Sequence, residues 1–184
     1  MSRIPALFAA VAAAALVAGS ATAALKEGAK APMFSAPGYE GGKPLKFDLA
    51  AALKKGPVVL YFFPAAETTG CNLEAHLFAQ SIDKFHDAGA TVIGVTAGNL
   101  DKLAAFSKET EHCAGKFPVA ADPNAVIAKR YDASLSVWPG HSDRTSYVIA
   151  PDDKVIFAYS DLKANEHVDK TLAALSAWRT AHPH

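Results

Sequence analysis

Apolar residues gather in two kinds of pattern along this chain: unbroken runs and helical spacing. The run at 57–63 (PVVLYFF) predicts a buried strand. The segment 91–97 (TVIGVTA) predicts the next strand. Between the two, residues 72–88 carry apolar side chains at helical spacing, and Gly89 suits the end of a helix.

The other expected elements are shorter. Gly and Pro crowd residues 31–46, which predicts turns with short strands. Strands at 144–149 and 154–160, joined by the turn 150–153, predict a hairpin. Asn165 is expected to cap a final helix that ends near residue 180. The remaining expected elements are helices at 47–55, 101–114 and 123–131 and a strand at 117–121. Alternating strands and helices with a late hairpin predict a three-layer α/β sandwich with a mixed sheet.

The first 23 residues have the features of a cleavable secretory signal. Arg3 supplies a positive charge, residues 6–18 form a short apolar stretch, and residues 21–23 (ATA) have the form of a cleavage site. We therefore expect a signal at 1–23, one mature domain over residues 24–184, and a periplasmic or secreted location. An uncleaved anchor is the alternative, although the apolar stretch is too short to favour a membrane span.

Composition and charge exclude several classes of partner. The chain has 18 basic and 18 acidic residues without a basic block, which argues against nucleic acid or an acidic lipid surface. No membrane partner is expected once the signal is removed. Both cysteines, Cys71 and Cys113, lie beyond the signal, and in an oxidising compartment two cysteines are expected to be linked at some stage.

The candidate chemistry lies at residues 64–71 (PAAETTGC), between the first apolar strand and the helix after it. This position places Cys71 in or near a first helical turn, where unpaired N–H groups and the helix dipole stabilise a thiolate. The hydroxyls of Thr68 and Thr69 are close enough in sequence to hydrogen-bond the sulfur or a bound oxygen. A reactive thiol is therefore expected, with a small buried cysteine beside ordinary capping residues as the plain alternative.

The spacing Pro-x-x-x-Thr-x-x-Cys, formed by Pro64, Thr68 and Cys71, resembles the active-site signature of the peroxiredoxins, which are AhpC/TSA-like proteins. Glu74, three residues further on, makes the segment most similar to the bacterioferritin comigratory protein, or PrxQ, branch. The likeness extends from about residue 28 to about residue 178. It implies a thioredoxin-like fold, which the expected order of strands and helices also fits.

The resemblance implies a thiol-dependent peroxidase that uses no metal and no organic cofactor. In such an enzyme a peroxide oxidises Cys71, while Thr68 and Arg144 hold the reacting oxygens. Pro64 would shield the sulfur, and Glu74 would orient Arg144. The expected partners are the peroxide substrate and a thioredoxin-like or small-thiol reductant, and the expected assembly is a monomer or weak dimer.

Cys113 is the second cysteine with a candidate role. It shares helical spacing with Leu103 and Phe106 on one face of the expected helix, so core packing alone could explain it. A subset of the PrxQ branch carries its resolving cysteine on this helix, which implies a Cys71–Cys113 disulfide after oxidation. Many relatives instead carry that cysteine five residues after the first, where this chain has His76.

Other functions remain open from the sequence. A thioredoxin-like dithiol oxidoreductase needs Cys-x-x-Cys, and residues 71–74 (CNLE) lack the second sulfur. The main alternative is an exported thioredoxin-fold module without peroxidase activity, either metal-binding or disulfide-stabilised. The side chains that could supply such a metal site are His76, His112, Cys113, His182 and His184. Their scatter along the chain favours ordinary surface histidines.

Overall fold

The computed structural model describes residues 24–183, so the expected signal at 1–23 lies outside the described residues. The strands are β1 (Ser35–Glu40), β2 (Lys43–Asp48), β3 (Val58–Ala65), β4 (Thr91–Gly98), β5 (Val119–Ala121), β6 (Thr145–Ile149) and β7 (Val155–Ser160). The α-helices are α1 (Leu49–Leu53), α2 (Thr69–Gln80), α3 (Ile82–Asp87), α4 (Leu103–Lys108), α5 (Val126–Arg130) and α6 (His167–Ala181). Two short 3₁₀ turns, η1 (Leu100–Lys102) and η2 (Pro123–Ala125), complete the described part. None of its helices combines the length and the apolarity needed to cross a membrane.

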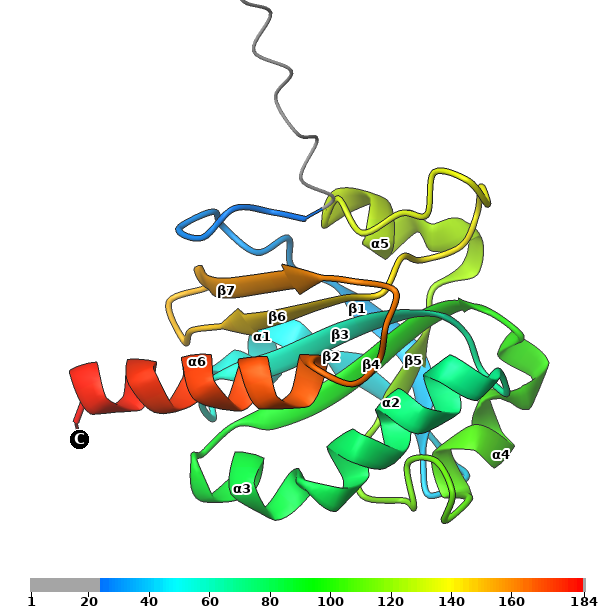
Figure 1. The fold of residues 1–184 in the computed structure, drawn as a ribbon, viewed down its shortest axis with the longest axis horizontal. Coiled ribbons are helices and arrows are strands. Elements are labelled where there is room, and N and C mark those ends of the chain that lie inside the picture. Colours follow the sequence, from blue (N-terminus) through cyan, green and yellow to red (C-terminus); the bar gives the residue numbers. More distant parts are fainter. Residues whose placement is uncertain (1–23, 184) are drawn as a thin grey trace, which may run out of the picture.

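The strands form one mixed sheet with the order β2-β1-β5-β4-β3-β6-β7 (Figure 1). β3, β4 and β5 are parallel neighbours, whereas β6 lies antiparallel to β3, with Phe62 opposite Thr145. The N-terminal end of β6 therefore meets the C-terminal end of β3. This register brings Arg144, which precedes β6, to the loop that follows β3.

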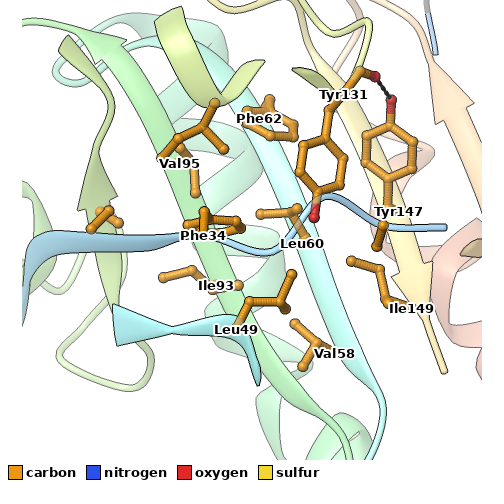
Figure 2. Packing of buried hydrophobic residues seen from close by; sticks show 14 of the residues in the cluster. Phe34, Leu49, Val58, Leu60, Phe62, Ile93, Val95, Tyr131, Tyr147 and Ile149 are labelled. Atoms are coloured by element: carbon orange, nitrogen blue, oxygen red, sulfur yellow. Dashed lines mark hydrogen bonds between the residues drawn. The ribbon is translucent and has the colours of Figure 1, made fainter. Parts of the chain in front are cut away.

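The sheet separates two hydrophobic cores. Side chains of β3 alternate between them, because successive residues of a strand point to opposite faces. Val58, Leu60 and Phe62 pack on one face with residues of α1 and α5, as Figure 2 shows for the β3 side chains. Val59, Tyr61 and Phe63 pack on the other face with residues of α2, α3, α4 and α6. Burial on both faces explains the unbroken apolar run. The expected α/β sandwich with a mixed sheet is confirmed.

The expected helix at 72–88 is two helices rather than one. The chain bends at Ser81, where φ and ψ are −100° and 3°, and α3 continues in a new direction. The ammonium group of Lys116 donates to the Ala79 carbonyl at 3.0 Å and so satisfies a backbone acceptor near the bend. The apolar spacing predicted the helical content correctly but could not reveal this long-range contact.

The expected helix at 101–114 is wrong in its second half. Helix α4 ends at Lys108, because Glu109 takes an extended conformation, and residues 110–115 form turns. Ala114 and Gly115 both have positive φ, 53° and 68°. Cys113 therefore lies in a turn and not on a helix.

The starts of two other helices differ from expectation. Asp48 ends β2 and caps α1, since its carboxylate accepts from the Ala51 N–H at 2.8 Å, so no helix begins at residue 47. Asn165 does not cap the final helix, which begins at His167 after Glu166. The imidazole of His167 is fully buried and hydrogen-bonded, and this packing fixes where α6 begins.

Candidate active site

The loop between β3 and α2 is held by side-chain hydrogen bonds to its carbonyls. Thr68 Oγ1 donates to the Ala65 carbonyl at 3.0 Å, and Asn99 Nδ2 donates to the Ala66 carbonyl at 2.7 Å. Glu67 has a positive φ of 59°, and Thr68 is extended in the position that precedes the helix. This short loop connects the C-terminal end of the central strand β3 to the start of α2.

Cys71 is the third residue of α2, so its expected place in the first helical turn is confirmed. Its side chain is 1% exposed, and the thiol is free. The first N–H groups of a helix have no partner within the helix and carry the positive end of its dipole. Both features favour an anion at the sulfur.

Three hydrogen bonds hold the guanidinium of Arg144 beside this sulfur. Its Nη2 donates to Cys71 Sγ at 3.5 Å, its Nη1 donates to Glu74 Oε2, and its Nε donates to the Leu162 carbonyl at 2.8 Å. A Cβ at Gly70 would lie 3.1 Å from Nη2, so a residue without a side chain gives the guanidinium room. The structure thus brings together Cys71, Arg144 and Glu74, three of the residues that the sequence singled out.

The charges of this group are coupled. Burial disfavours the charged form of Arg144, but Glu74 and the Cys71 thiol outweigh it and raise the pKa of the guanidinium, which stays cationic. Glu74 is completely buried, and burial raises the pKa of its carboxyl while Arg144 opposes that rise. A buried cation that contacts both the Cys71 sulfur and the Glu74 carboxyl group is therefore a constant feature of the site.

Pro64 and Thr68 lie at the rim of this group. Pro64 belongs to the end of β3, one residue beyond the expected strand, and its carbonyl accepts from Thr96 Oγ1 at 3.2 Å. The Thr68 hydroxyl is exposed and bonds the Ala65 carbonyl. Among the described residues the sulfur is bonded by Arg144 and not by Thr68 or Thr69, so of the two expected partners of these hydroxyls, the sulfur or a bound oxygen, only the second remains a prediction.

A buried histidine that the sequence did not single out, His167, lies beside Oε1 of Glu74, whereas Arg144 bonds Oε2. His167 Nε2 donates to the Asp161 carbonyl at 2.8 Å, so Nδ1 accepts from Ser146 Oγ at 2.8 Å. Nδ1 also lies 3.6 Å from Glu74 Oε1. Burial lowers the pKa of His167 to about 4, and the ring is neutral near pH 7. Ser146 and His167 fall in different expected elements, a strand and the final helix. No local sequence pattern relates either residue to Glu74.

This histidine gives a prediction for stability. The folded pKa of His167 lies below its ordinary 6.5, so its contribution is complete above about pH 6.5 and is lost as the pH falls toward 4. The loss is up to about 3 kcal/mol, since one pKa unit corresponds to about 1.4 kcal/mol. We expect His167→Gln, which can keep both hydrogen bonds, to lose less free energy of unfolding than wild type between pH 7 and pH 4.5. Urea unfolding at both pH values measures this, and equal losses would contradict it.

Cys113 lies in the same hydrophobic core as Cys71. Its thiol is free and 0% exposed, and burial, followed by the charge of Glu67, raises its pKa well above the ordinary value. Glu67 belongs to the loop that precedes Cys71. The active-site loop and the Cys113 turn are therefore neighbours.

The histidines considered as metal ligands are not gathered into one site. His76 Nε2 pairs with Gln80, and His182 Nδ1 lies against the Trp178 carbonyl. His184 lies outside the described residues. Among the histidines of residues 24–183, His112 alone joins a group of metal-capable side chains, with Glu67 and Glu109 as its neighbours.

Comparisons with known proteins agree with this geometry. Residues 28–158 match the AhpC/TSA family. The chain is 29% identical to the chloroplastic peroxiredoxin Q of Sedum lineare over 156 residues, which cover 84% of this chain and 80% of the relative. A putative peroxiredoxin of Mycobacterium tuberculosis strain H37Rv is 31% identical over 135 residues, covering 72% of this chain and 86% of the relative.

The crystal structure of the peroxidoxin BcpB from Mycobacterium tuberculosis superimposes with a TM-score of 0.72 at 31% identity, covering 83% of this chain and 97% of that chain. A reduced 2-Cys peroxiredoxin from Plasmodium vivax, at 21% identity, shares the fold with a TM-score of 0.75. The fold is therefore thioredoxin-like, and the protein is a thiol-dependent peroxidase. The chain belongs to the AhpC/TSA family, with relatives in the PrxQ and bacterioferritin comigratory protein branch.

Proposed function

We propose that Cys71 reduces hydrogen peroxide or an organic hydroperoxide and that Cys113 resolves the oxidised sulfur in an intramolecular disulfide. A thioredoxin-like protein or a small thiol then restores both thiols. The observation that carries the first step is the contact of Arg144 with both Cys71 Sγ and Glu74 at the start of α2. It combines a nucleophile, a fixed cation and a helix N-terminus at one point.

In the first step the Cys71 thiolate attacks one peroxide oxygen and the O–O bond breaks. The sulfur is oxidised by two electrons to a sulfenic acid, and the other oxygen leaves as hydroxide or alkoxide and takes up a proton. Negative charge develops on the leaving oxygen, where the Nη2 group of Arg144 can donate a hydrogen bond. Glu74 holds that guanidinium in place, so charge stabilisation needs no rearrangement.

Thr68 and Pro64 would shape the entrance. The Thr68 hydroxyl donates its hydrogen bond to the Ala65 carbonyl, so its oxygen lone pairs are free to accept a hydrogen bond from a peroxide O–H. Pro64 has no N–H to offer and limits the hydration of the sulfur. These two residues would orient the peroxide, while Arg144 stabilises the charge.

In the second step the Cys113 sulfur displaces water from the sulfenic acid and forms the S–S bond. Both thiols are buried in the reduced protein, so the chain must move for this reaction. Residues 110–115 are turns rather than helix, and opening turns breaks fewer backbone hydrogen bonds than unwinding a helix. The position of Cys113 in a turn, rather than in the expected helix, therefore supports its role as the resolving cysteine.

Cys113→Ser tests the resolving step. After one equivalent of peroxide, we expect a Cys71–Cys113 disulfide in wild type and a persistent sulfenic acid on Cys71 in the variant. Non-reducing peptide mapping detects the disulfide, and trapping with dimedone followed by mass spectrometry detects the sulfenic acid. If oxidised wild type keeps Cys113 free, the protein is a one-cysteine enzyme that depends on an external thiol.

A further inference from the structure

A cluster of three side chains outside the Cys71–Arg144–Glu74 group has the composition of a metal site. One carboxylate oxygen from each of Glu67 and Glu109 and one ring nitrogen of His112 all lie within 4.8 Å of one another. Nδ1 is 3.6 Å from Glu67 Oε1 and 3.9 Å from Glu109 Oε2, beyond the range of a hydrogen bond. The cluster joins the active-site loop to the turn that carries Cys113.

The polar atoms at its centre lack partners. The His112 side chain is only 6% exposed, its Nδ1 has no hydrogen bond, and its ring stacks on Phe106 with the centroids 5.0 Å apart. Glu67 Oε1 is likewise buried without a hydrogen bond. Buried polar atoms without partners are costly and rare in folded proteins. The two carboxylates that approach Nδ1 of His112 would stabilise a positive charge bound between them.

The spacing and chemistry of these donors fit zinc. Ligand atoms 2.0–2.2 Å from a tetrahedral Zn²⁺ lie about 3.3–3.6 Å apart. The distances from His112 Nδ1 to the Glu67 and Glu109 oxygens, 3.6 and 3.9 Å, are at or slightly above this range. One imidazole and two carboxylates supply three ligands and leave the fourth position for water. Mg²⁺ and Ca²⁺ prefer six or more oxygen ligands, which this group does not offer. Glu109 is 56% exposed, so an ion can enter from solvent on its side.

We propose that Glu67, Glu109 and His112 bind a divalent transition metal ion of the Zn²⁺ type. Glu67 precedes Thr68 in the active-site loop, whereas His112 and Glu109 belong to the turn around Cys113. The bound ion links these two segments. If Cys113 resolves Cys71, which rests on the proposed function, the ion holds Cys113 in its packed position and slows formation of the disulfide.

Calorimetric titration of the reduced protein with Zn²⁺ in a phosphine reductant tests the site without using activity. We expect one bound ion, and at least a tenfold loss of affinity in Glu109→Gln and in His112→Gln, because changing even an outer-shell partner costs about 10–100-fold. Glu109 is more than half exposed, so its variant does not threaten the fold. The exposed neighbour Glu111→Gln and the surface His86→Gln are the matched controls and should bind as wild type does.

Both thiols remain in every variant, so zinc held by cysteines would bind equally in all of them. Absence of binding, or equal affinity in wild type, Glu109→Gln and His112→Gln, overturns the site and leaves the cluster as a Glu–His pair. In a second measurement, Zn²⁺ should slow the Cys71–Cys113 disulfide in wild type and not in Glu109→Gln. If zinc binds at this cluster but no disulfide forms in either protein, the resolving role fails and the metal site stands.

Discussion

Replacing Cys71 by serine is expected to abolish peroxide reduction while the fold stays intact. Cys71 lies at the start of α2 with Arg144 Nη2 at 3.5 Å, an environment that stabilises a thiolate. A serine hydroxyl is not ionised there near pH 7 and is a weak nucleophile without an adjacent base. Stopped-flow measurement of peroxide consumption by reduced protein gives the rate for each form.

The unfolding midpoint in urea separates loss of the thiol from loss of the fold. Serine is nearly the size of cysteine, so Cys71→Ser should keep a cooperative transition and the wild-type circular dichroism spectrum. If folded Cys71→Ser protein consumed peroxide at a rate near that of wild type, another group would be the one that reacts with peroxide. Cys113 would be the first candidate.

Arg144→Ala is expected to slow the reaction with peroxide by about 10²–10³-fold, the usual effect of removing one preorganised donor from a developing oxyanion. Arg144 also contacts the sulfur, so both the nucleophile and the leaving oxygen lose a cation. Single-turnover kinetics, with pre-reduced protein mixed with excess peroxide in the absence of reductant, isolates this step. Arg130→Ala is the matched control, because Arg130 is exposed and bonds the Met33 carbonyl, and its rate should equal that of wild type.

Arg144→Ala also leaves Glu74 buried without its cation, and breaking a buried pair costs roughly 3–5 kcal/mol. The double variant Arg144→Ala with Glu74→Gln removes the unpaired charge and should recover most of this stability. The double variant should remain as slow as Arg144→Ala, because the donor to the leaving oxygen is still missing. Recovery of the rate together with stability would mean that Arg144 only maintains the fold.

The sequence predicted those parts of the molecule that depend on neighbouring residues. The run at 57–63 is apolar because β3 is covered on both faces, and this local pattern was enough to predict a buried strand. The place of Cys71 followed from a strand, a short polar loop and a helix in immediate succession. The family signature formed by Pro64, Thr68 and Cys71 then indicated the chemistry.

The errors came from segments whose ends depend on distant contacts. Helical spacing continued through residues 101–114, but Glu109 is extended, Ala114 has a positive φ and His112 lies beside the distant Glu67, so the chain forms turns. In the same way the segment 72–88 bends at Ser81, where the distant Lys116 meets the nearby Ala79 carbonyl. Helix propensity is a weak preference that such tertiary contacts override.

By itself the sequence determined the central strands, the α/β class and the place of a cysteine at a helix start, because each depends on residues close together in the chain. Tertiary structure alone decided what surrounds that thiol. The antiparallel pairing of β6 with β3 brings Arg144 to Cys71, and the packing of α6 brings His167 to Glu74. The approach of Glu67 to His112 has the same origin. These groups are 45 to 93 residues apart in sequence, as the numbering shows, and only the folded sheet, with its fixed register, brings them within a few ångströms of one another.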